Sequence, residues 1–211
     1  MSMDIKNKIT SLHLDALKEI GNIGAGHAAT ALSKLLNKKI DMKVPDVHIA
    51  SFDEIMELIG GAEIVVVSVF LRIEGEAPGN IFFIVPIEQG ENFIRSMTGD
   101  TTFSFLEPPY SELGLSAMLE LGNILSGSYL TALSDFTQLD MYPSVPALSI
   151  DMFGSIISYG LIELSQVSDY AIVVDTVVND GHPQNSDVKG HFFLFPDPDS
   201  YEKIFRALRI D

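Results

Sequence analysis

Cysteine is absent from this 211-residue chain, basic residues are scarce, and no apolar run is long. Without cysteine the chain can form neither a disulfide nor a thiolate metal site, and it has no cysteine nucleophile. Its 13 lysines and arginines are outnumbered by 29 acidic residues, which gives a net charge of −16. Binding to nucleic-acid phosphates or to an anionic membrane surface needs a basic patch, so we expect neither partner.

The sequence also lacks the segments that direct a protein into or across a membrane. Residues 1–10 contain lysines with no apolar run behind them, unlike a signal peptide. Apolar runs such as residues 64–71 are far too short for a membrane-spanning helix, which needs about 20 residues. Together with the lack of cysteine, these features predict a cytoplasmic protein with no membrane insertion.

Common catalytic and metal-binding motifs are missing as well. Residues 21–26, GNIGAG, lack the spacing of a nucleotide-binding loop, and no expected strand precedes them. The five histidines show no spacing typical of metal ligands. Asp197 and Asp199 are more typical of a turn and a helix cap than of a metal site. We therefore expect no metal site formed by the chain itself.

One segment of the chain occurs twice. Residues 14–33 and 115–134 are related by a shift of 101 positions, and 11 of their 20 positions are identical. A duplicated core would keep its apolar residues and let its polar ones vary, yet here a glutamate, an asparagine and a later proline all recur. These residues are Glu19, Asn22 and Pro45 in the first copy and Glu120, Asn123 and Pro146 in the second. Their retention indicates a chemical role.

Both copies have the pattern of an amphipathic helix. Positions i, i+4 and i+7 share one face of an α-helix, and polar triplets occupy this spacing twice. The triplets are Asp15, Glu19 and Asn22, and Ser116, Glu120 and Asn123. The opposite side of each helix is apolar and can be buried against a sheet. A single polar face would be an ordinary solvated surface, but two matching faces favour binding or catalysis.

The segments that follow the two copies also correspond. We expect helices at about 12–37, 52–59, 89–97, 111–136, 154–164 and 200–209, and strands at about 39–51, 63–74, 80–86, 139–152, 170–179 and 190–196. Pro45 indicates a sheet edge or a bulge. Because each half alone has too few strands to bury its helices well, we predict an α+β fold. Residues 1–211 would form one pseudo-twofold domain with repeats at about 12–100 and 111–211, sharing a largely antiparallel sheet with both long helices on one face.

A glutamate and an asparagine without a nucleophile or a metal cannot carry out a difficult reaction unaided. They could complete a site that already holds a metal ion and a phosphoryl group. Phosphoryl transfer is catalysed chiefly by positioning and charge stabilisation, so an amide that orients water would suffice. An aspartyl phosphate, which is already activated, is the natural target.

The pattern D/S-x3-E-x2-N, followed by proline after 22 further residues, resembles the signature of the CheC/CheX/FliY family of chemotaxis phosphatases. The pattern fits in both copies, and the resemblance extends over the full chain. With two motifs and no appended flagellar-switch domain, the chain is most similar to the CheC type of this family.

This resemblance implies hydrolysis of the aspartyl phosphate of the response regulator CheY. The two glutamates would pair with the active-site lysine of CheY, and the two asparagines would orient the attacking water. The residues implied are Glu19, Asn22, Glu120 and Asn123 for catalysis, with Asp15, Pro45, Ser116 and Pro146 as supporting positions. The Mg²⁺ would belong to CheY, so the chain would need no cofactor of its own.

The resemblance also implies a second partner, the receptor deamidase CheD. We expect CheD to dock around Ser149–Ile157, where the two halves diverge, with Asp151 as the acidic contact. An alternative role for Asp151 is that of a helix N-cap. Two other functions stay open, namely a non-catalytic adaptor for CheD or phosphorylated CheY and a structural flagellar-switch component. We expect the chain to act as a monomer.

Overall fold

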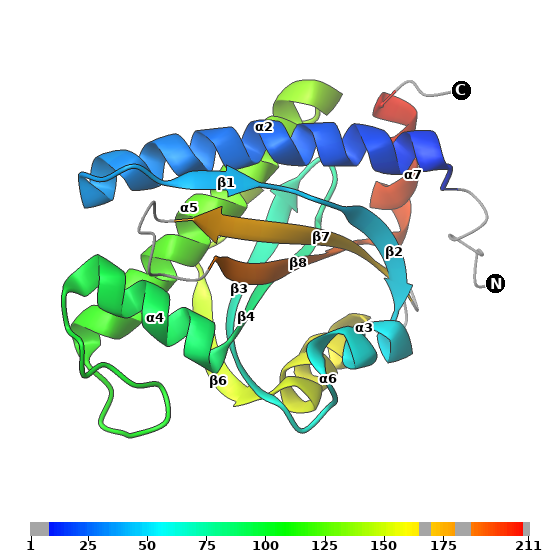
Figure 1. Ribbon diagram of the computed structural model, residues 1–211. Coiled ribbons are helices and arrows are strands. Elements are labelled where there is room, and N and C mark those ends of the chain that lie inside the picture. The colour runs from blue at the N-terminus through cyan, green and yellow to red at the C-terminus, as the bar shows by residue number, and fades with distance from the viewer. Residues whose placement is uncertain (1–8, 165–169, 180–186, 209–211) are drawn as a thin grey trace.

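Helices and strands follow one another in the same order in both halves of the chain (Figure 1). The computed structural model describes residues 9–164, 170–179 and 187–208. The first half contains α2 (Ser11–Leu36), β1 (Asp41–Lys43), β2 (Val47–Ser51), α3 (Phe52–Ile59), β3 (Val65–Gly75), β4 (Gly79–Pro86) and α4 (Ile87–Thr98). The second half contains α5 (Glu112–Thr137), β5 (Met141–Pro143), β6 (Ala147–Met152), α6 (Phe153–Leu164), β7 (Tyr170–Asn179), β8 (Val188–Pro196) and α7 (Pro198–Ala207).

The two long helices, α2 and α5, have similar caps. Thr10 caps α2 and Ser111 caps α5, and in each case the side chain accepts a hydrogen bond from the backbone three residues on. The helices end at Asn37 and Gln138, which both adopt the left-handed conformation with φ of 49° and 57°. These two residues are also 101 positions apart, so the repeat extends to the last turn of each helix.

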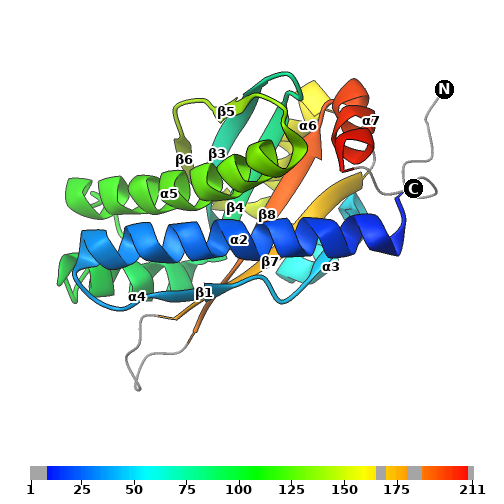
Figure 2. The same ribbon diagram turned by 90° about the horizontal axis from the view of Figure 1, so that it is seen from above.

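All eight strands of the described residues join one antiparallel sheet, in which the two halves are interlocked. The outer strands β1 and β2 of the first half pair with β7 of the second half. Likewise, β5 and β6 of the second half pair with β3 of the first half, while β4 and β8 pair at the centre. Helices α2 and α5 lie side by side over one face of this sheet (Figure 2). The predicted α+β fold class is thereby confirmed.

A bulge divides each of the two strands predicted at 39–51 and 139–152. Lys43 pairs with Val177 and Val47 with Val174, so three residues of one strand lie opposite two of β7. The same offset recurs between β5 and β6 along β3. The bulge indicated by Pro45 is therefore confirmed, and each predicted strand consists of two short strands. We call residues 44–46 the first bulge and residues 144–146 the second bulge.

The long helices contact each other closely at Gly24 of α2. A Cβ atom at this position would lie 2.8 Å from Cδ1 of Tyr129 on α5, so glycine permits the approach. The ring of Tyr129 packs edge-on against Phe192 with ring centres 4.6 Å apart, and its hydroxyl shares a 3.0 Å hydrogen bond with that of Thr176. Burial raises the pKa of Tyr129 to about 12, so this hydroxyl stays protonated. These contacts fix α5 on strands β7 and β8.

The other face of the sheet is covered by the short helices α3 and α6 (Figure 1). Aromatic side chains of the central strands form the core beneath them, including Phe82, Phe193 and Phe195, and Phe153 of α6 joins this core. The sheet thus separates two cores, a large one under α2 and α5 and a smaller one under α3 and α6. Among the residues that the structure describes, no helix is both long and apolar enough to cross a membrane.

Candidate functional site

The two Glu–Asn pairs lie on the outward sides of α2 and α5. Both glutamates are exposed, as are Asp15 and Ser116, whereas both asparagines are half-buried at the flanks of their helices. The inner stripe of each helix explains this placement, because it is buried against the sheet. The stripe includes Leu17, Ile20, Gly24 and Ala28 on α2, and Met118, Leu121, Leu125 and Tyr129 on α5. Within the described ranges, neither glutamate side chain makes a hydrogen bond or an ion pair.

The side chain of Asn22 is bound to the first bulge. Its Oδ1 accepts a 2.9 Å hydrogen bond from the backbone N–H of Val44. Its Nδ2 donates to the Val44 carbonyl at 3.2 Å and to the Lys18 carbonyl, one turn back on the helix, at 3.0 Å. Both donors of the amide are therefore used, and the amide binds Val44 as a neighbouring strand would. In this arrangement Asn22 has a structural role.

The contact between Asn22 and Val44 accounts for the fixed spacing of the asparagine and the proline. Val44 is only 2% exposed, and its side chain packs on Gly21, where a Cβ would lie 3.3 Å from Val44 Cγ2. Pro45 follows directly, restricts Val44 to an extended conformation and needs no hydrogen bond for its nitrogen. Two adjacent residues of α2, Gly21 and Asn22, thus contact Val44 of the first bulge.

Asn123 has no such attachment, although it occupies the equivalent position on α5. Its amide makes no hydrogen bond within the described part of the chain. The valine that corresponds to Val44 is Val145, which is 88% exposed instead of buried. The side chain of Asn123 is therefore available to a bound partner, and the same sequence motif has two different structures in the two halves.

The second bulge is attached to β3 instead of to α5. The backbone N–H of Ser144 donates to the Arg72 carbonyl at 2.8 Å, and the Ser144 hydroxyl accepts from the Arg72 N–H at 2.9 Å. The same hydroxyl donates to the Val145 carbonyl at 3.2 Å. These bonds hold the second bulge in place without a contact from Asn123. Lys43, which precedes Val44 in the first half, has no hydroxyl and so cannot make the two side-chain bonds.

The surface around each pair is open. Gly26 and Gly127 lie one turn beyond the asparagines, and nothing lies within 4 Å of where their Cβ atoms would be. Ile23, beside Asn22, is 42% exposed. Each helix therefore presents a carboxylate, an amide and a gap for another backbone on one accessible face. This arrangement suits docking against the active site of another protein.

The chemistry available at these faces is limited to positioning. An exposed carboxylate can pair with a cation, and an amide one turn away can hold a water molecule. The described residues do contain a group of possible metal ligands, but it consists of Asp46, His48 and Asp175, and neither helix motif contributes to it. This group of possible metal ligands is therefore separate from the two Glu–Asn faces.

Asp151, the expected CheD contact, lies in the outer strand β6 and is exposed. Its Oδ1 accepts a 2.7 Å hydrogen bond from the backbone N–H of Met152, the next residue. Helix α6 begins at Phe153, so Asp151 stands one residue before the N-cap position. An N-cap side chain binds the N–H groups two or three residues on. The position of Asp151 thus differs from that of an N-cap.

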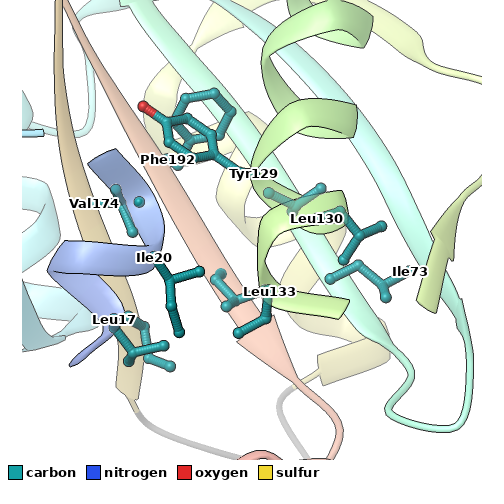
Figure 3. A pocket seen from close by; sticks show the side chains of 12 residues that line it. Leu17, Ile20, Ile73, Tyr129, Leu130, Leu133, Val174 and Phe192 are labelled. Carbon is teal, nitrogen blue, oxygen red and sulfur yellow. The ribbon is translucent and has the colours of Figure 1, made fainter. Parts of the chain in front are cut away.

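A small cavity lies between the two long helices and the sheet (Figure 3). Its volume is about 50 Å³, and its lining is apolar, with Leu17 and Ile20 from α2 facing Leu130 and Leu133 from α5. Pockets for small molecules are usually several hundred Å³ in volume and contain a few polar groups. This cavity is too small and too apolar for such a role, so it belongs to the core.

Comparison with known proteins gives consistent matches. A model of the CheC-like family matches residues 12–49 and 113–150, which contain both Glu–Asn pairs and both bulges. The CheY-P phosphatase CheC of Bacillus subtilis (strain 168) is 52% identical over 206 residues, covering 98% of each chain. Thermotoga maritima FliY shares the fold with a TM-score of 0.72 and 20% identity, over 95% of this chain and 98% of that one. A CheX–CheY–BeF₃–Mg²⁺ complex from Borrelia burgdorferi gives 0.50 at 17% identity, over 82% and 96%.

The sequence motif identified the residues on the helix faces but not their partners in the strands. Val44 and Val145 are both valines before a proline, and nothing in the sequence separates a buried valine bound by Asn22 from an exposed one. The signal that could have been used was the preceding residue, which is Lys43 in one copy and Ser144 in the other. A serine two residues before the proline can bind the neighbouring strand through its hydroxyl, whereas a lysine has no hydroxyl to do so.

Proposed function

The chain belongs to the CheC-like family, and we propose that it is a phosphatase that hydrolyses the aspartyl phosphate of phosphorylated CheY. The observation that carries this proposal is the pair of Glu120 and Asn123 on the outward side of α5, with the amide of Asn123 unbonded within the described ranges. The activity named for the Bacillus subtilis relative supports the same reaction. Glu19 and Asn22 on α2 provide a second candidate site.

In the proposed complex, α5 lies against the phosphorylated face of CheY. The exposed carboxylate of Glu120 pairs with the active-site lysine of CheY, and this ion pair fixes the position of the helix. Asn123, one turn further along the same face, then reaches the phosphoryl group. The open space at Gly127 lets the CheY backbone approach the helix.

The amide of Asn123 holds a water molecule in line with the bond between phosphorus and the aspartyl oxygen. The water oxygen bonds to phosphorus while this P–O bond breaks, so that the aspartate carboxylate is released and a water proton leaves with inorganic phosphate. Mg²⁺ carried by CheY neutralises charge on the phosphoryl oxygens, and the chain supplies no metal to the reaction. The Borrelia burgdorferi complex, which contains CheY together with Mg²⁺, supports this division.

The pair on α2 acts as a slower second site in this proposal. Before Asn22 can hold water, its amide must release the backbone N–H and carbonyl of Val44. Each such hydrogen bond contributes about 0.5–1.5 kcal/mol. We therefore propose that Asn22 chiefly maintains the first bulge and that α5 carries most of the turnover.

We also propose that CheD binds at the outer strand β6 and the start of α6, within Ser149–Ile157. The exposed residues of this segment include Ser149, Asp151 and Met152, with Met152 44% exposed. An outer strand offers unpaired backbone groups to a partner, and a carboxylate beside an apolar side chain adds specificity. The position of Asp151 before the cap supports a contact role for its carboxylate.

A non-catalytic adaptor is the alternative, and the attachment of Asn22 favours it for α2 in particular. A helix whose amide is fully bonded could dock on phosphorylated CheY through Glu19 without hydrolysing it. An adaptor would slow or leave unchanged the loss of phosphate from CheY, whereas a phosphatase accelerates it. The rate of phosphate loss from CheY therefore distinguishes the two functions.

The experiment is to measure phosphate release from phosphorylated CheY with and without this protein. We expect acceleration by the native chain and none by Asn22→Ala/Asn123→Ala, whose circular dichroism should remain that of a folded protein. Acceleration by the double variant equal to that of the native chain would overturn the mechanism. Binding of phosphorylated CheY without any acceleration by the native chain would establish the adaptor instead.

The CheD contact is tested with purified CheD and two matched variants. Asp151→Ala should weaken CheD binding about tenfold or more, roughly 1.4 kcal/mol, while CheY dephosphorylation is retained. Asp41→Ala removes an exposed carboxylate from the outer strand β1 at the other edge of the sheet and should leave CheD binding unchanged. Equal CheD affinity in the native chain and in Asp151→Ala would place the interface elsewhere.

A further inference from the structure

A second group of polar side chains lies on the face of the sheet opposite α2 and α5. Asp175 on β7 pairs directly with His191 on β8, and the backbone N–H of Asp175 donates to the Asp46 carbonyl at 3.1 Å. His48 lies on β2, two residues after Asp46. Paired residues of antiparallel strands project to the same face, and the side chains of Asp46 and His48 are 3.5 Å apart. All four side chains therefore lie together on this face of the sheet, next to the core under α3 and α6.

Three of these residues lie close enough together to share a metal ion. One ligand atom from each of Asp46, His48 and Asp175 lies within 4.8 Å of the other two. The Nδ1 of His48 is 3.5 Å from Asp46 Oδ2, which is too long for a good hydrogen bond. Within the described residues this Nδ1 is buried and has no hydrogen-bond partner. Burying a polar nitrogen without a partner is unfavourable, and a cation bound between His48 and Asp46 would satisfy it.

The fourth residue, His191, holds one of these ligands in place. Its Nδ1 lies 2.7 Å from Oδ1 of Asp175, and both side chains are largely buried. A hydrogen bond to one carboxylate oxygen leaves the other oxygen free and fixes its direction. Carboxylates that bind metals are commonly oriented in this way by a partner behind them.

The other half of the molecule shows that the fold does not require these polar residues. Where β7 and β8 place Asp175 opposite His191, β3 and β4 place Phe70 opposite Phe82, with ring centres 4.9 Å apart. The residues that correspond to Asp46 and His48 are also simpler. They are Ala147, which pairs with Phe70, and Ser149. The same four positions thus hold three apolar residues and a serine in one half, and two aspartates and two histidines in the other.

We propose that Asp46, His48 and Asp175 bind one divalent transition-metal ion such as Zn²⁺, with His191 positioning Asp175. One imidazole and two carboxylates are suitable ligands for Zn²⁺, and small side-chain rotations would bring them to about 2.0–2.2 Å from the ion. Three protein ligands leave a fourth position for water or for a partner's side chain. This proposal departs from the sequence-based expectation that the chain forms no metal site of its own.

This site is close to the first bulge and does not depend on the proposed phosphatase activity. Asp46 is the last residue of the bulge, whose first residue, Val44, is bound by Asn22 from the other side of the sheet. A metal ion at Asp46 and His48 would hold the bulge from the face opposite α2. Metal binding should therefore stabilise the folded chain, and this effect can be measured without CheY.

The test is to strip the chain of metal, then titrate it with Zn²⁺ by calorimetry and with Co²⁺ by visible absorption. We expect one ion per chain, Co²⁺ bands of low-symmetry nitrogen and oxygen coordination, and a Tm that rises with Zn²⁺ concentration. Asp46→Asn and His48→Ala should each weaken Zn²⁺ binding at least tenfold. His27→Ala, an exposed histidine on α2, and Ser149→Ala, the counterpart of His48, should bind Zn²⁺ like the native chain.

Two results would overturn the site. One is a native chain that binds less than half an equivalent of Zn²⁺ and shows no rise in Tm. The other is equal Zn²⁺ affinity in the native chain, Asp46→Asn and His48→Ala. Because Asp46 is exposed, Asp46→Asn should fold normally, and it decides the question even where His48→Ala does not fold.

Discussion

Asn22 and Asn123 occupy equivalent positions on equivalent helices, yet Asn22 is bound to the strand beside it and Asn123 is not. Three hydrogen bonds engage the Asn22 amide, whereas the bulge next to Asn123 is bound by Ser144 to Arg72. The comparison shows that one residue type at one spacing can serve two purposes. In the first half the asparagine maintains the backbone, and in the second half it is free for a ligand.

The free-energy difference between the two asparagine sites follows from these hydrogen bonds. Releasing Val44 from Asn22 breaks two hydrogen bonds worth about 0.5–1.5 kcal/mol each. At roughly 1.4 kcal/mol per factor of ten, an opening free energy of about 2 kcal/mol leaves only a few per cent of the α2 sites open at a time. The two sites should therefore differ in rate by about an order of magnitude or more.

The largest expected effect is on activity. Asn123→Ala should lower CheY-P hydrolysis about tenfold or more, because it removes the amide that is already free. Asn22→Ala should lower it less than about twofold, since the α2 site contributes little. The measurement is phosphate release under identical CheY-P concentrations. Equal losses in the two variants would mean that both amides are open during turnover.

The second expected effect is on stability, where Asn22 matters more than Asn123. Asn22→Ala should lower the free energy of unfolding by about 1–3 kcal/mol, because the buried backbone of Val44 loses its partners. Asn123→Ala should change it by less than about 0.5 kcal/mol. Urea unfolding of the two variants measures both values. A stable Asn22→Ala variant would show that water replaces the amide easily.

A third change tests the attachment of the second bulge. Ser144→Ala removes the acceptor for the Arg72 N–H and should lower the free energy of unfolding by about 1 kcal/mol. Ser149→Ala, on the adjacent strand β6, removes an exposed hydroxyl and should change it by less than about 0.5 kcal/mol. If the two variants are equally stable by urea unfolding, the bulge is held by its backbone alone.

The smallest expected effect comes from filling the gaps on the helix faces. Gly26→Ala and Gly127→Ala should each raise the free energy of unfolding by about 0.5–1 kcal/mol, because both positions are helical and open. Gly127→Ala should nevertheless slow CheY-P hydrolysis more than Gly26→Ala, since it narrows the approach to Asn123. Faster or unchanged hydrolysis in Gly127→Ala would place the CheY backbone elsewhere.

Much of the fold could be predicted because the signals are local. The helix at 52–59 and the strand at 170–179 coincide with α3 and β7, since their apolar period and their flanking polar or glycine residues are explicit in the sequence. The exchange of outer strands between the halves could not be predicted. Valine-rich strands pair equally well with several neighbours, and only the complete packing selects one.

Of the two candidate sites, one could be predicted from the sequence and the other could not. The Glu–Asn faces are predictable from the sequence because the repeat contains them twice with the same helical spacing. The group at Asp46, His48 and Asp175 was missed because its members lie on strands that are far apart in the chain and adjacent only in the sheet. A search for ligand spacing within one segment detects sites formed on a helix or a loop, and this group has no such spacing.

The interlocked sheet also sets the order in which the chain can complete its structure as it is made. Strands β1 and β2 leave the ribosome early, but their partner β7 begins only at Tyr170, after residues 52–169 have been synthesised. At roughly 5–20 residues per second, those strands stay unpaired for about 6–24 s. Unpaired strand edges invite association between nascent chains.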